Sequence, residues 1–292
     1  MSQYVIERPL GRSGLSVPAL GVGTNRWRCD QPDQACLQDT FAAAIDAGTA
    51  FFDTAEIYQR GRSEQALHGA AGRDGRSVLL ASKFAPYPHR IAVAQFTLAL
   101  DKTLRRLGRD VLDVYYLHSP SSRRSIGTWM KAMATAVRAG KIRAVGVSNC
   151  DVAQMRQAAD ALARYGIPLA ANQVHYSLLH RAPETDGVLE ACRQMDVALV
   201  AYRPVGKGVL GAGAPGRDAR PELAEALQKI AASRDATTPQ VALAWLLKRD
   251  DHVIPIPGAT TPGHVRENAG ALSLELTGDE FAILDRASAQ AA

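Results

Sequence analysis

Four ionisable residues lie at or just beyond the ends of separate apolar runs, and together they have the chemistry of a proton relay. They are Asp53, Tyr58, Lys83 and His118. A phenol is a weak acid at neutral pH, but a nearby ammonium favours the phenolate and lowers the pKa of the phenol. A carboxylate can hold that ammonium, and an imidazole can share the proton or orient a substrate oxygen. The set suits protonation of an alkoxide that forms on a carbonyl carbon, which requires a separate hydride donor.

Each of these residues also has a purely structural interpretation. Asp53 could cap a helix, and Tyr58 could be an ordinary loop aromatic. Lys83 could be a charge on the rim of the molecule, and His118 could simply end a strand. The catalytic interpretation therefore depends on a fold that brings all four to one place.

Strand and helix patterns alternate along the chain. Residues 4–18 predict a hairpin with Gly11 and Gly14 in its turn. Short apolar or β-branched runs predict strands at 19–24, 50–54, 77–84, 111–118, 142–149, 169–176, 197–204 and 252–258. Amphipathic stretches predict helices at 33–47, 63–71, 91–107, 127–139, 151–165, 184–195, 238–249 and 262–270, with two extra helices at 221–234 and 277–289.

This alternation predicts an α/β fold, a (β/α)8 TIM barrel that occupies residues 1–292 as a single domain, with an N-terminal β-hairpin and two extra helices. An open doubly wound sheet is the alternative, and its usual flag, GxGxxG, occurs once from Gly206 to Gly211. Because Pro204 precedes that match and Ala-Gly-Ala-Pro-Gly follows it, we interpret it as a flexible loop.

A barrel would explain the position of the proton-relay residues. Catalytic groups of such barrels lie at the carboxyl ends of the strands. The second, third and fourth predicted strands bring Asp53, Lys83 and His118 to that face, and Tyr58 follows closely enough to fold back over it.

Composition narrows the classes of function. Hydrophobic residues make up 47% and charged residues 22%, as in ordinary globular proteins. The net charge is +5, but no Lys/Arg run marks a nucleic-acid partner. No apolar run approaches the roughly 20 residues that cross a bilayer, and the N-terminus has no secretory h-region. The four cysteines, Cys29, Cys36, Cys150 and Cys192, lack metal-site spacing, so we expect reduced thiols, no metal and a cytoplasmic location.

Seven segments of the chain resemble, in order and spacing, the signature segments of the aldo-keto reductases: FDTAEIYQRGRSEQALHGA, LLASKF, LDVYYLH, AVGVSN, NQVHYSLL, VAYRPVGKGVL and IPIPGATTPGHVRENAGAL. The segment KFAPYPHRIAVAQF has a weaker resemblance to the branch of plant chloroplast and pyridoxal-type reductases. The resemblance implies reversible, NADPH-dependent reduction of aldehydes and ketones to alcohols. It makes Tyr58 the general acid, with Lys83 lowering its pKa, Asp53 holding Lys83, and His118 bonding the carbonyl oxygen.

The resemblance also implies a nicotinamide dinucleotide site. Ser148, Asn149 and Gln173 would grip the carboxamide, and Tyr202 would stack on the nicotinamide ring. The pyrophosphate would lie at 203–206, where Arg203 replaces a common serine and either pairs with a phosphate or points to solvent. The expected cofactor contacts are Thr24, Ser148, Asn149, Gln173, Tyr202, Arg203, Pro204, Val205, Gly206, Gly208, Pro257, Gly258, Thr260, His264, Glu267 and Asn268.

The adenosine end departs from the best-studied branch of the family. Gly258, Ala259 and His264 stand where that branch supplies a lysine, a serine and an arginine to the 2′-phosphate. NADP(H) is favoured by the resemblance, and NAD(H) remains possible.

Trp27 and Tyr87 are expected to line the substrate pocket, and the short loops predict weak discrimination among small aldehydes. The expected partner is a small aldehyde or ketone, with the protein a monomer or weak oligomer. Two other functions remain open. One is a cofactor-binding regulatory subunit that resembles potassium-channel β subunits. The other is a Schiff-base aldolase that uses Lys83, although a neighbouring Asp53 would keep that lysine charged.

Overall fold

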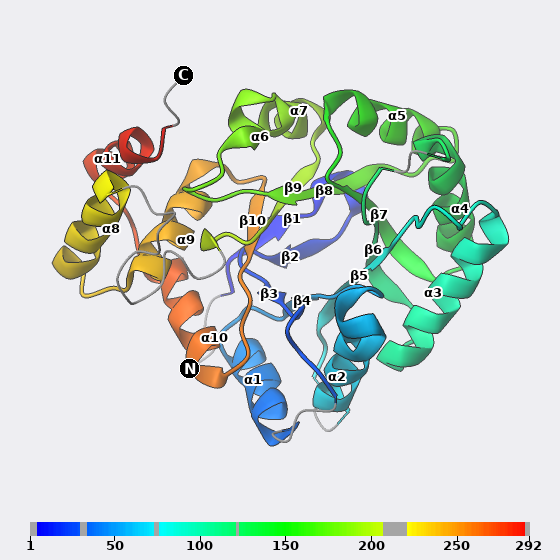
Figure 1. Ribbon diagram of the computed structural model, residues 1–292, viewed down its shortest axis with the longest axis horizontal. Helices are drawn as coiled ribbons and strands as arrows, with labels where there is room; N and C mark the ends of the chain where they lie inside the picture. The colour runs from blue at the N-terminus through cyan, green and yellow to red at the C-terminus, as the bar shows by residue number, and fades with distance from the viewer. Residues whose placement is uncertain (1–4, 30–33, 73–75, 121–122, 207–220, 290–292) are drawn as a thin grey trace.

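Eight parallel strands surround the centre of the molecule in the computed structural model, which describes residues 5–29, 34–72, 76–120, 123–206 and 221–289 (Figure 1). The strand order in the sheet is β10-β9-β8-β7-β6-β5-β4-β3. The strands are β3 (Val22–Gly23), β4 (Phe51–Asp53), β5 (Leu79–Phe84), β6 (Leu112–Leu117), β7 (Ile142–Ser148), β8 (Leu169–His175), β9 (Ala198–Tyr202) and β10 (Val253–Ile256).

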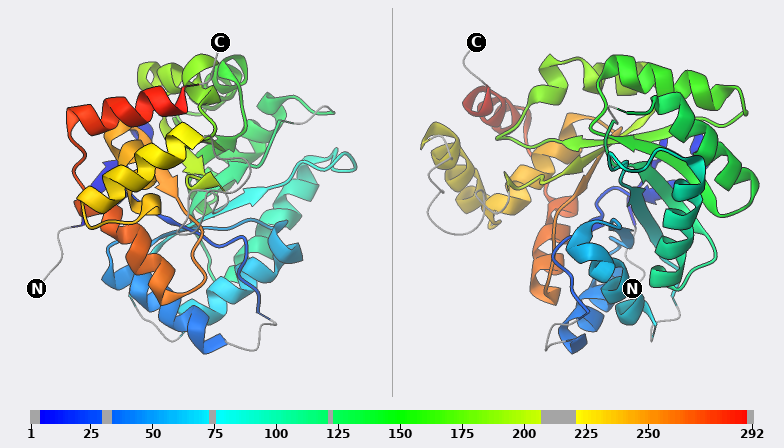
Figure 2. Two further views of the ribbon diagram at one scale, coloured as in Figure 1. Left: turned by 60° about the vertical axis from the view of Figure 1, so that its left-hand side comes forward. Right: turned by 45° about the vertical axis from the view of Figure 1, so that its right-hand side comes forward.

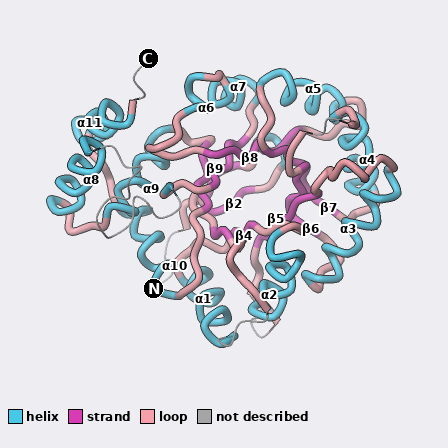
Figure 3. Tube along the Cα trace, in the orientation of Figure 1, coloured by secondary structure: helices cyan, strands magenta, loops and turns pink. Residues whose placement is uncertain are grey.

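Helices form an outer ring around these strands (Figure 3). They are α1 (Gln34–Asp46), α2 (Arg62–Ala71), α3 (Val93–Leu107), α4 (Ile126–Arg138), α5 (Val152–Ala163), α6 (Ala182–Thr185), α7 (Val188–Met195), α8 (Pro221–Ser233), α9 (Thr238–Arg249), α10 (Pro262–Ala269) and α11 (Gly278–Ser288). The two extra helices predicted from the sequence are α8 and α11, which pack together at the side of the barrel (Figure 2). The predicted segment 184–195 is divided, because Gly187 adopts a positive φ of 82° between α6 and α7.

The first and last strands of the sheet meet and close the barrel. The amide of Gly21 donates to the Pro255 carbonyl and that of Gly23 to the Pro257 carbonyl, both at 2.9 Å. Gly23 and Gly258 also form a parallel bridge. A Cβ atom at Gly23 would lie 3.1 Å from the Ile256 carbonyl oxygen, so this approach favours glycine. The predicted eight-stranded barrel is confirmed.

The predicted hairpin, β1 (Glu7–Pro9) and β2 (Ser16–Pro18), covers the N-terminal end of the barrel. Its turn contains Gly11, whose φ is 53° and whose added Cβ would lie 2.7 Å from the carbonyl oxygens of Ala170 and Asp196. Glycine therefore lets the hairpin approach the start of β8 and the segment just before β9. The hairpin leaves the opposite end, where the strands finish, open for chemistry.

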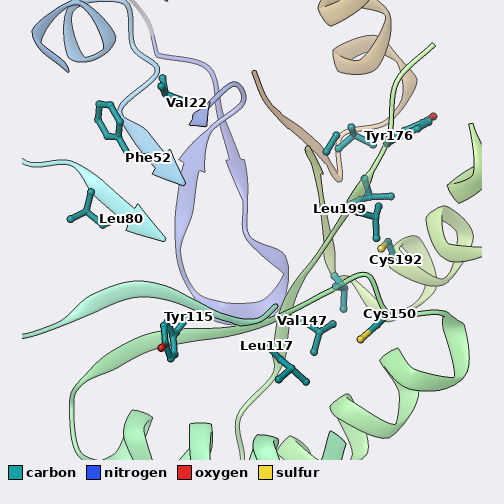
Figure 4. Packing of buried hydrophobic residues seen from close by; sticks show 14 of the residues in the cluster. Val22, Phe52, Leu80, Tyr115, Leu117, Val147, Cys150, Tyr176, Cys192 and Leu199 are labelled. Atoms are coloured by element: carbon teal, nitrogen blue, oxygen red, sulfur yellow. The ribbon is translucent and has the colours of Figure 1, made fainter. Parts of the chain in front are cut away.

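Alternation along the strands divides the core into two layers. Val114 and Tyr116 of β6 point into the barrel, whereas Tyr115 and Leu117 point outward to the helices. Figure 4 shows two outward residues, Val147 and Leu199, between the strands and the helices. Burial on both faces explains why the strands read as continuous apolar runs. Within the described residues, no helix is both long and apolar enough to cross a membrane.

Candidate active site

The four proton-relay residues lie together at the carboxyl ends of neighbouring strands. Asp53 ends β4, Lys83 lies on β5, and His118 follows β6. Lys83 Nζ lies 2.5 Å from Asp53 Oδ1 and 4.7 Å from the centroid of the Tyr58 ring. The rings of Tyr58 and His118 meet edge to face with their centroids 5.8 Å apart. The arrangement concentrates a carboxylate, an ammonium, a phenol and an imidazole in one place.

The electrostatics of the relay depend on burial as well as on charge. Burial raises the pKa of Tyr58, while Lys83 lowers it and Asp53 raises it, so the net direction is upward. Burial lowers the pKa of Lys83, but Asp53 and Tyr58 together raise it above its usual value. The expectation of a net lowering of the Tyr58 pKa is therefore wrong in this structure, although Lys83 acts in the predicted direction. The phenol is protonated and the lysine charged at neutral pH.

His118 is held in its neutral form. Burial and the charge of Lys83 lower the pKa of His118 to about 3. Its Nδ1 atom is buried and has no hydrogen-bond partner among the described residues. A neutral imidazole beside a protonated phenol can orient an oxygen atom without competing for the phenol's proton.

Gln173 has a second partner that the sequence did not indicate. Its Nε2 atom donates to Asp53 Oδ2 at 2.8 Å, from β8 on the opposite side of the barrel. Asp53 thus receives Lys83 on one oxygen and Gln173 on the other. The side-chain carbonyl of Gln173 and one amide proton are not used in this contact, so Gln173 can still contribute to a carboxamide site.

The backbone beside Tyr58 is strained. Gln59 and Arg60, which follow it directly, have positive φ values of 50° and 58°. Such conformations cost free energy in residues other than glycine and persist where the surrounding structure imposes them. The Gln59 side chain donates to the carbonyl of Asn25 at 3.1 Å. This turn points the phenol of Tyr58 back over the strand ends.

A cleft of about 870 Å³ opens above the relay and runs across the carboxyl ends of the strands. This volume suits a ligand larger than a simple aldehyde. The cleft contains the predicted cofactor residues Thr24, Ser148, Asn149, Gln173, Tyr202, Arg203, Pro204, Val205, Gly258, Thr260, His264, Glu267 and Asn268. Gly206 and Pro257 are next to cleft-lining residues in the sequence but do not line the cleft themselves. Gly208, with the rest of the GxGxxG match after Gly206, lies outside the described residues.

Hydrogen bonds organise the part of the cleft nearest the relay. Tyr202 donates its hydroxyl to Asn149 Oδ1 at 3.0 Å, and Asn149 Nδ2 donates to Ser148 Oγ at 3.1 Å and to the His118 carbonyl at 3.2 Å. Asn149 has a positive φ of 56°, which turns its side chain toward these partners. Ser148 donates in turn to the carbonyl of Gln173 at 2.7 Å. The network joins β7, β8 and β9 at the strand ends.

Arg203 lies against Tyr202. Its guanidinium carbon is 5.7 Å from the centroid of the Tyr202 ring, and its φ is 53°. The Arg203 charge lowers the pKa of both Tyr58 and Tyr202, although burial raises each of them overall. Arg203 lines the cleft and is also exposed to solvent, so its pairing with a phosphate stays a prediction.

The far end of the cleft is the N-terminus of α10. Thr261 caps this helix by accepting a hydrogen bond from the His264 amide at 3.2 Å. The Thr260 hydroxyl lies 3.4 Å from Nδ1 of His264. A helix N-terminus with a hydroxyl and an imidazole beside it suits a phosphate group.

The two residues expected to line the substrate pocket lie elsewhere. Trp27 is 0% exposed, packs against Phe52, and donates its indole N–H to the Ala259 carbonyl at 2.6 Å. The expectation that Trp27 lines the pocket is wrong, because this contact turns the indole into the core. Tyr87 is 41% exposed and stacks on His89, outside the cleft lining.

Asn25, Arg26 and Ile57 line the cleft instead and were missed in the sequence. They follow β3 and β4, so the same strand-end rule could have found them. The described residues contain no group of three His, Cys, Asp or Glu residues that could hold a metal ion. No disulfide joins any of the four cysteines, which all lie within the described residues.

A model of the aldo/keto reductase family matches residues 19–289. The NADP(+) aldo-keto reductase yakc of Schizosaccharomyces pombe is 33% identical, over 90% of this chain and 86% of that protein. The chloroplastic pyridoxal reductase of Arabidopsis thaliana is 33% identical, over 94% of this chain and 84% of that protein. Methylglyoxal reductase YeaE of Escherichia coli is 34% identical, over 94% and 92%, respectively.

Solved structures give the same result. The thermostable aldo-keto reductase Tm1743, solved with the inhibitor epalrestat, has a TM-score of 0.84 and 33% identity, covering 97% of this chain and 99% of that one. An aldo-keto reductase from Klebsiella pneumoniae, solved with NADPH, has a TM-score of 0.81 and 32% identity, covering 97% and 95%. Both comparisons extend over nearly the whole barrel.

Proposed function

Because the chain belongs to the aldo/keto reductase family, we propose that it reduces small aldehydes and ketones to alcohols with NADPH, in a reversible reaction that uses Tyr58 as the acid. The observation that carries the proposal is the position of the Tyr58 phenol, between the Lys83 ammonium and the His118 ring, below a large cleft. Family membership alone supports an oxidoreductase that acts on carbonyl groups. The roles of individual residues are inferred from this geometry.

The donor set of the cleft fits a nicotinamide dinucleotide. Ser148, Asn149 and Gln173 provide amide and hydroxyl groups for a carboxamide, and the Tyr202 ring provides a stacking surface. Arg203 and Arg26 supply positive charge in the middle of the cleft, and the start of α10 supplies an anion site at its far end. When bound, the cofactor supplies the hydride.

The residues of the chain handle the proton. Tyr58 gives its phenolic proton to the carbonyl oxygen, and the Lys83 ammonium stabilises the phenolate that is left. The neutral His118 ring donates a hydrogen bond to the same oxygen from its other nitrogen and orients it toward Tyr58. Asp53 and Gln173 keep Lys83 in position through the contacts on the two carboxylate oxygens. In the reverse direction the Tyr58 phenolate accepts the proton of the alcohol.

Two observations support NADP(H) over NAD(H). The Klebsiella pneumoniae structure was solved with NADPH, and the name of the Schizosaccharomyces pombe relative includes NADP(+). In this chain, Thr260 and His264 would receive the 2′-phosphate at the start of α10. Pyridoxal and methylglyoxal, the substrates in the names of two relatives, are the first compounds to test.

The aldolase alternative is disfavoured by the protonation of Lys83. A Schiff base forms only from a neutral amine, and Asp53 and Tyr58 raise the pKa of this lysine. A regulatory subunit without turnover remains the second alternative. It would also bind the cofactor, so binding alone does not separate the two functions.

Two measurements on the purified protein test the proposal. Fluorescence titration with NADPH and NADH should show binding, with the lower Kd for NADPH. Steady-state assays should show oxidation of NADPH that depends on an added aldehyde such as pyridoxal or methylglyoxal. Binding without turnover on a broad aldehyde panel would favour the regulatory subunit, and no binding of either dinucleotide would refute the proposal. A single domain, a cytoplasmic location and a monomeric or weakly oligomeric state stay predictions.

A further inference from the structure

Three aromatic rings form a row beside the cleft. The rings of His180 and His175 stack with their centroids 4.1 Å apart and their planes 9° apart. His175 stacks in turn on Tyr202, with centroids 5.4 Å apart and planes 11° apart. The row thus leads from the surface, through His175, to the aromatic ring that lines the cleft.

The backbone fixes this row. His175 and Tyr202 end the neighbouring strands β8 and β9 and are partners in the parallel register. Adjacent side chains in such a pair lie on the same face of the sheet, so their rings meet. A tight turn then brings His180 back, because the amides of Ser177 and His180 each donate to the carbonyl of the other residue.

Only Tyr202 of the three rings lines the cleft. His175 and His180 are both half-buried behind it. Tyr202 is held at its hydroxyl by Asn149, and His175 lies against one face of its ring. A flat ligand that stacks on Tyr202 must therefore use the other face.

A metal site does not explain the histidine pair. Rings that stack face to face direct their nitrogen lone pairs sideways and not toward a common point. Nor do the described residues hold a third His, Cys, Asp or Glu placed to complete a metal site with them.

We propose that His175, supported by His180, is a positioning residue that holds the Tyr202 ring in the orientation needed to stack on the nicotinamide ring. This inference rests on the proposed function. Without the row, the Tyr202 ring can tilt away from the cleft while its hydroxyl still reaches Asn149. His175 therefore acts on cofactor affinity through Tyr202 and has no contact with the cofactor itself.

The test compares a variant that keeps the stack with one that removes it. His175→Phe retains a flat ring, whereas His175→Leu does not. From the usual strength of an aromatic pair, His175→Leu should raise the Kd for NADPH about five-fold, measured by fluorescence quenching, and His175→Phe should leave it within about two-fold of the wild type. His180→Leu, which removes the outer ring only, should raise the Kd about two-fold. Thermal unfolding of each variant without cofactor checks that it is folded.

A double-mutant cycle with Tyr202→Leu tests whether the effect passes through Tyr202. In the Tyr202→Leu background, His175→Leu should cause no further rise in Kd. The matched control is His89→Leu, which removes another His–Tyr stack, between His89 and Tyr87, outside the cleft lining. It should leave the Kd for NADPH unchanged.

Several results would overturn the inference. One is an unchanged Kd for NADPH in His175→Leu. Another is a Kd in His175→Phe that rises as much as in His175→Leu. A third is an equal rise of the Kd from His175→Leu with and without the Tyr202 ring. If His175→Leu does not fold, the other two variants test the inference. A Kd for NADPH that rises in His175→Phe, or one that does not rise in His180→Leu, would then contradict it. Failure of the wild type to bind NADPH would instead refute the proposed function, and this inference with it.

Discussion

The ammonium nitrogen of Lys83 lies 4.7 Å from the centroid of the Tyr58 ring, at a site where no part of the lysine side chain is exposed. Burial of a phenol disfavours its ionised form, and the buried ammonium opposes that effect. In the proposed mechanism, Tyr58 therefore stays protonated until it gives its proton to the substrate oxygen, and Lys83 then stabilises the phenolate. A buried charge of this kind requires a partner, which Asp53 provides at 2.5 Å.

Replacing Lys83 by Met should impair both stability and turnover. Asp53 would keep a buried charge without its partner, so the free energy of unfolding should fall by about 3–5 kcal/mol. The pKa of Tyr58 would rise further, and turnover with an aldehyde should fall at least about a hundredfold. Urea unfolding and steady-state assays measure the two effects. Lys102→Met, on the exposed face of α3, is the matched control and should change neither. Wild-type turnover in Lys83→Met would contradict the role of the ammonium.

The lowered pKa of His118 predicts how the stability of the protein depends on pH. Its pKa is about 3 in the folded protein and about 6.5 when unfolded. The unfolded state therefore binds more protons between these values, so stability falls as pH falls from 6.5 toward 3. His118→Gln removes this contribution. Between pH 6.5 and pH 4.5, the wild type should lose about 2 kcal/mol more of its unfolding free energy than the variant. If urea unfolding shows the same loss of free energy in the wild type and the variant between the two pH values, the pKa of His118 is not lowered in the folded protein.

The position of His264 at the start of α10 leads to a prediction about the preference for NADPH over NADH. If His264 and Thr260 receive the 2′-phosphate, His264→Ala should raise the Kd for NADPH about tenfold and leave that for NADH unchanged. NADH serves as the internal control, because it lacks the 2′-phosphate and otherwise fills the same cleft. Fluorescence titration with both dinucleotides measures the effect. A similar loss for the two would place His264 away from the 2′-phosphate.

Replacing Trp27 should lower the stability of the protein without changing its substrate preference. Trp27→Phe would leave the buried Ala259 carbonyl without its donor, at a cost of about 1–3 kcal/mol in unfolding free energy. The relative kcat/KM values for a panel of aldehydes should be unaffected. If Trp27→Phe changes the order of the kcat/KM values among the aldehydes and leaves the stability unchanged, Trp27 lines the substrate pocket after all.

The strand ends explain what could be predicted from the sequence. Asp53, Lys83 and His118 were located correctly because runs buried on both faces mark parallel strands, and a barrel collects the strand ends at one face. Trp27 also follows a strand, but its direction depends on a hydrogen bond to Ala259, 232 positions later. No local pattern contains that information.

The sequence also could not predict whether the pKa of Tyr58 is raised or lowered. The sign of the pKa shift of Tyr58 depends on how fully the phenol is buried, and burial is a property of the assembled cleft. The same holds for the stack of His175 on Tyr202, which follows from a register between strands that are separate in sequence. The sequence pattern predicted which strand ends carry the ionisable groups, and tertiary contacts decided how these groups are arranged.

The most direct measurement is turnover of Tyr58→Phe alongside its affinity for NADPH. Phenylalanine keeps the ring against Lys83 and His118 and removes only the proton that is transferred. We predict a fall in kcat of about a hundred- to ten-thousandfold, with the Kd for NADPH within about two-fold of the wild type. A variant that retains most of its turnover would contradict the account, because the proton would then come from another group.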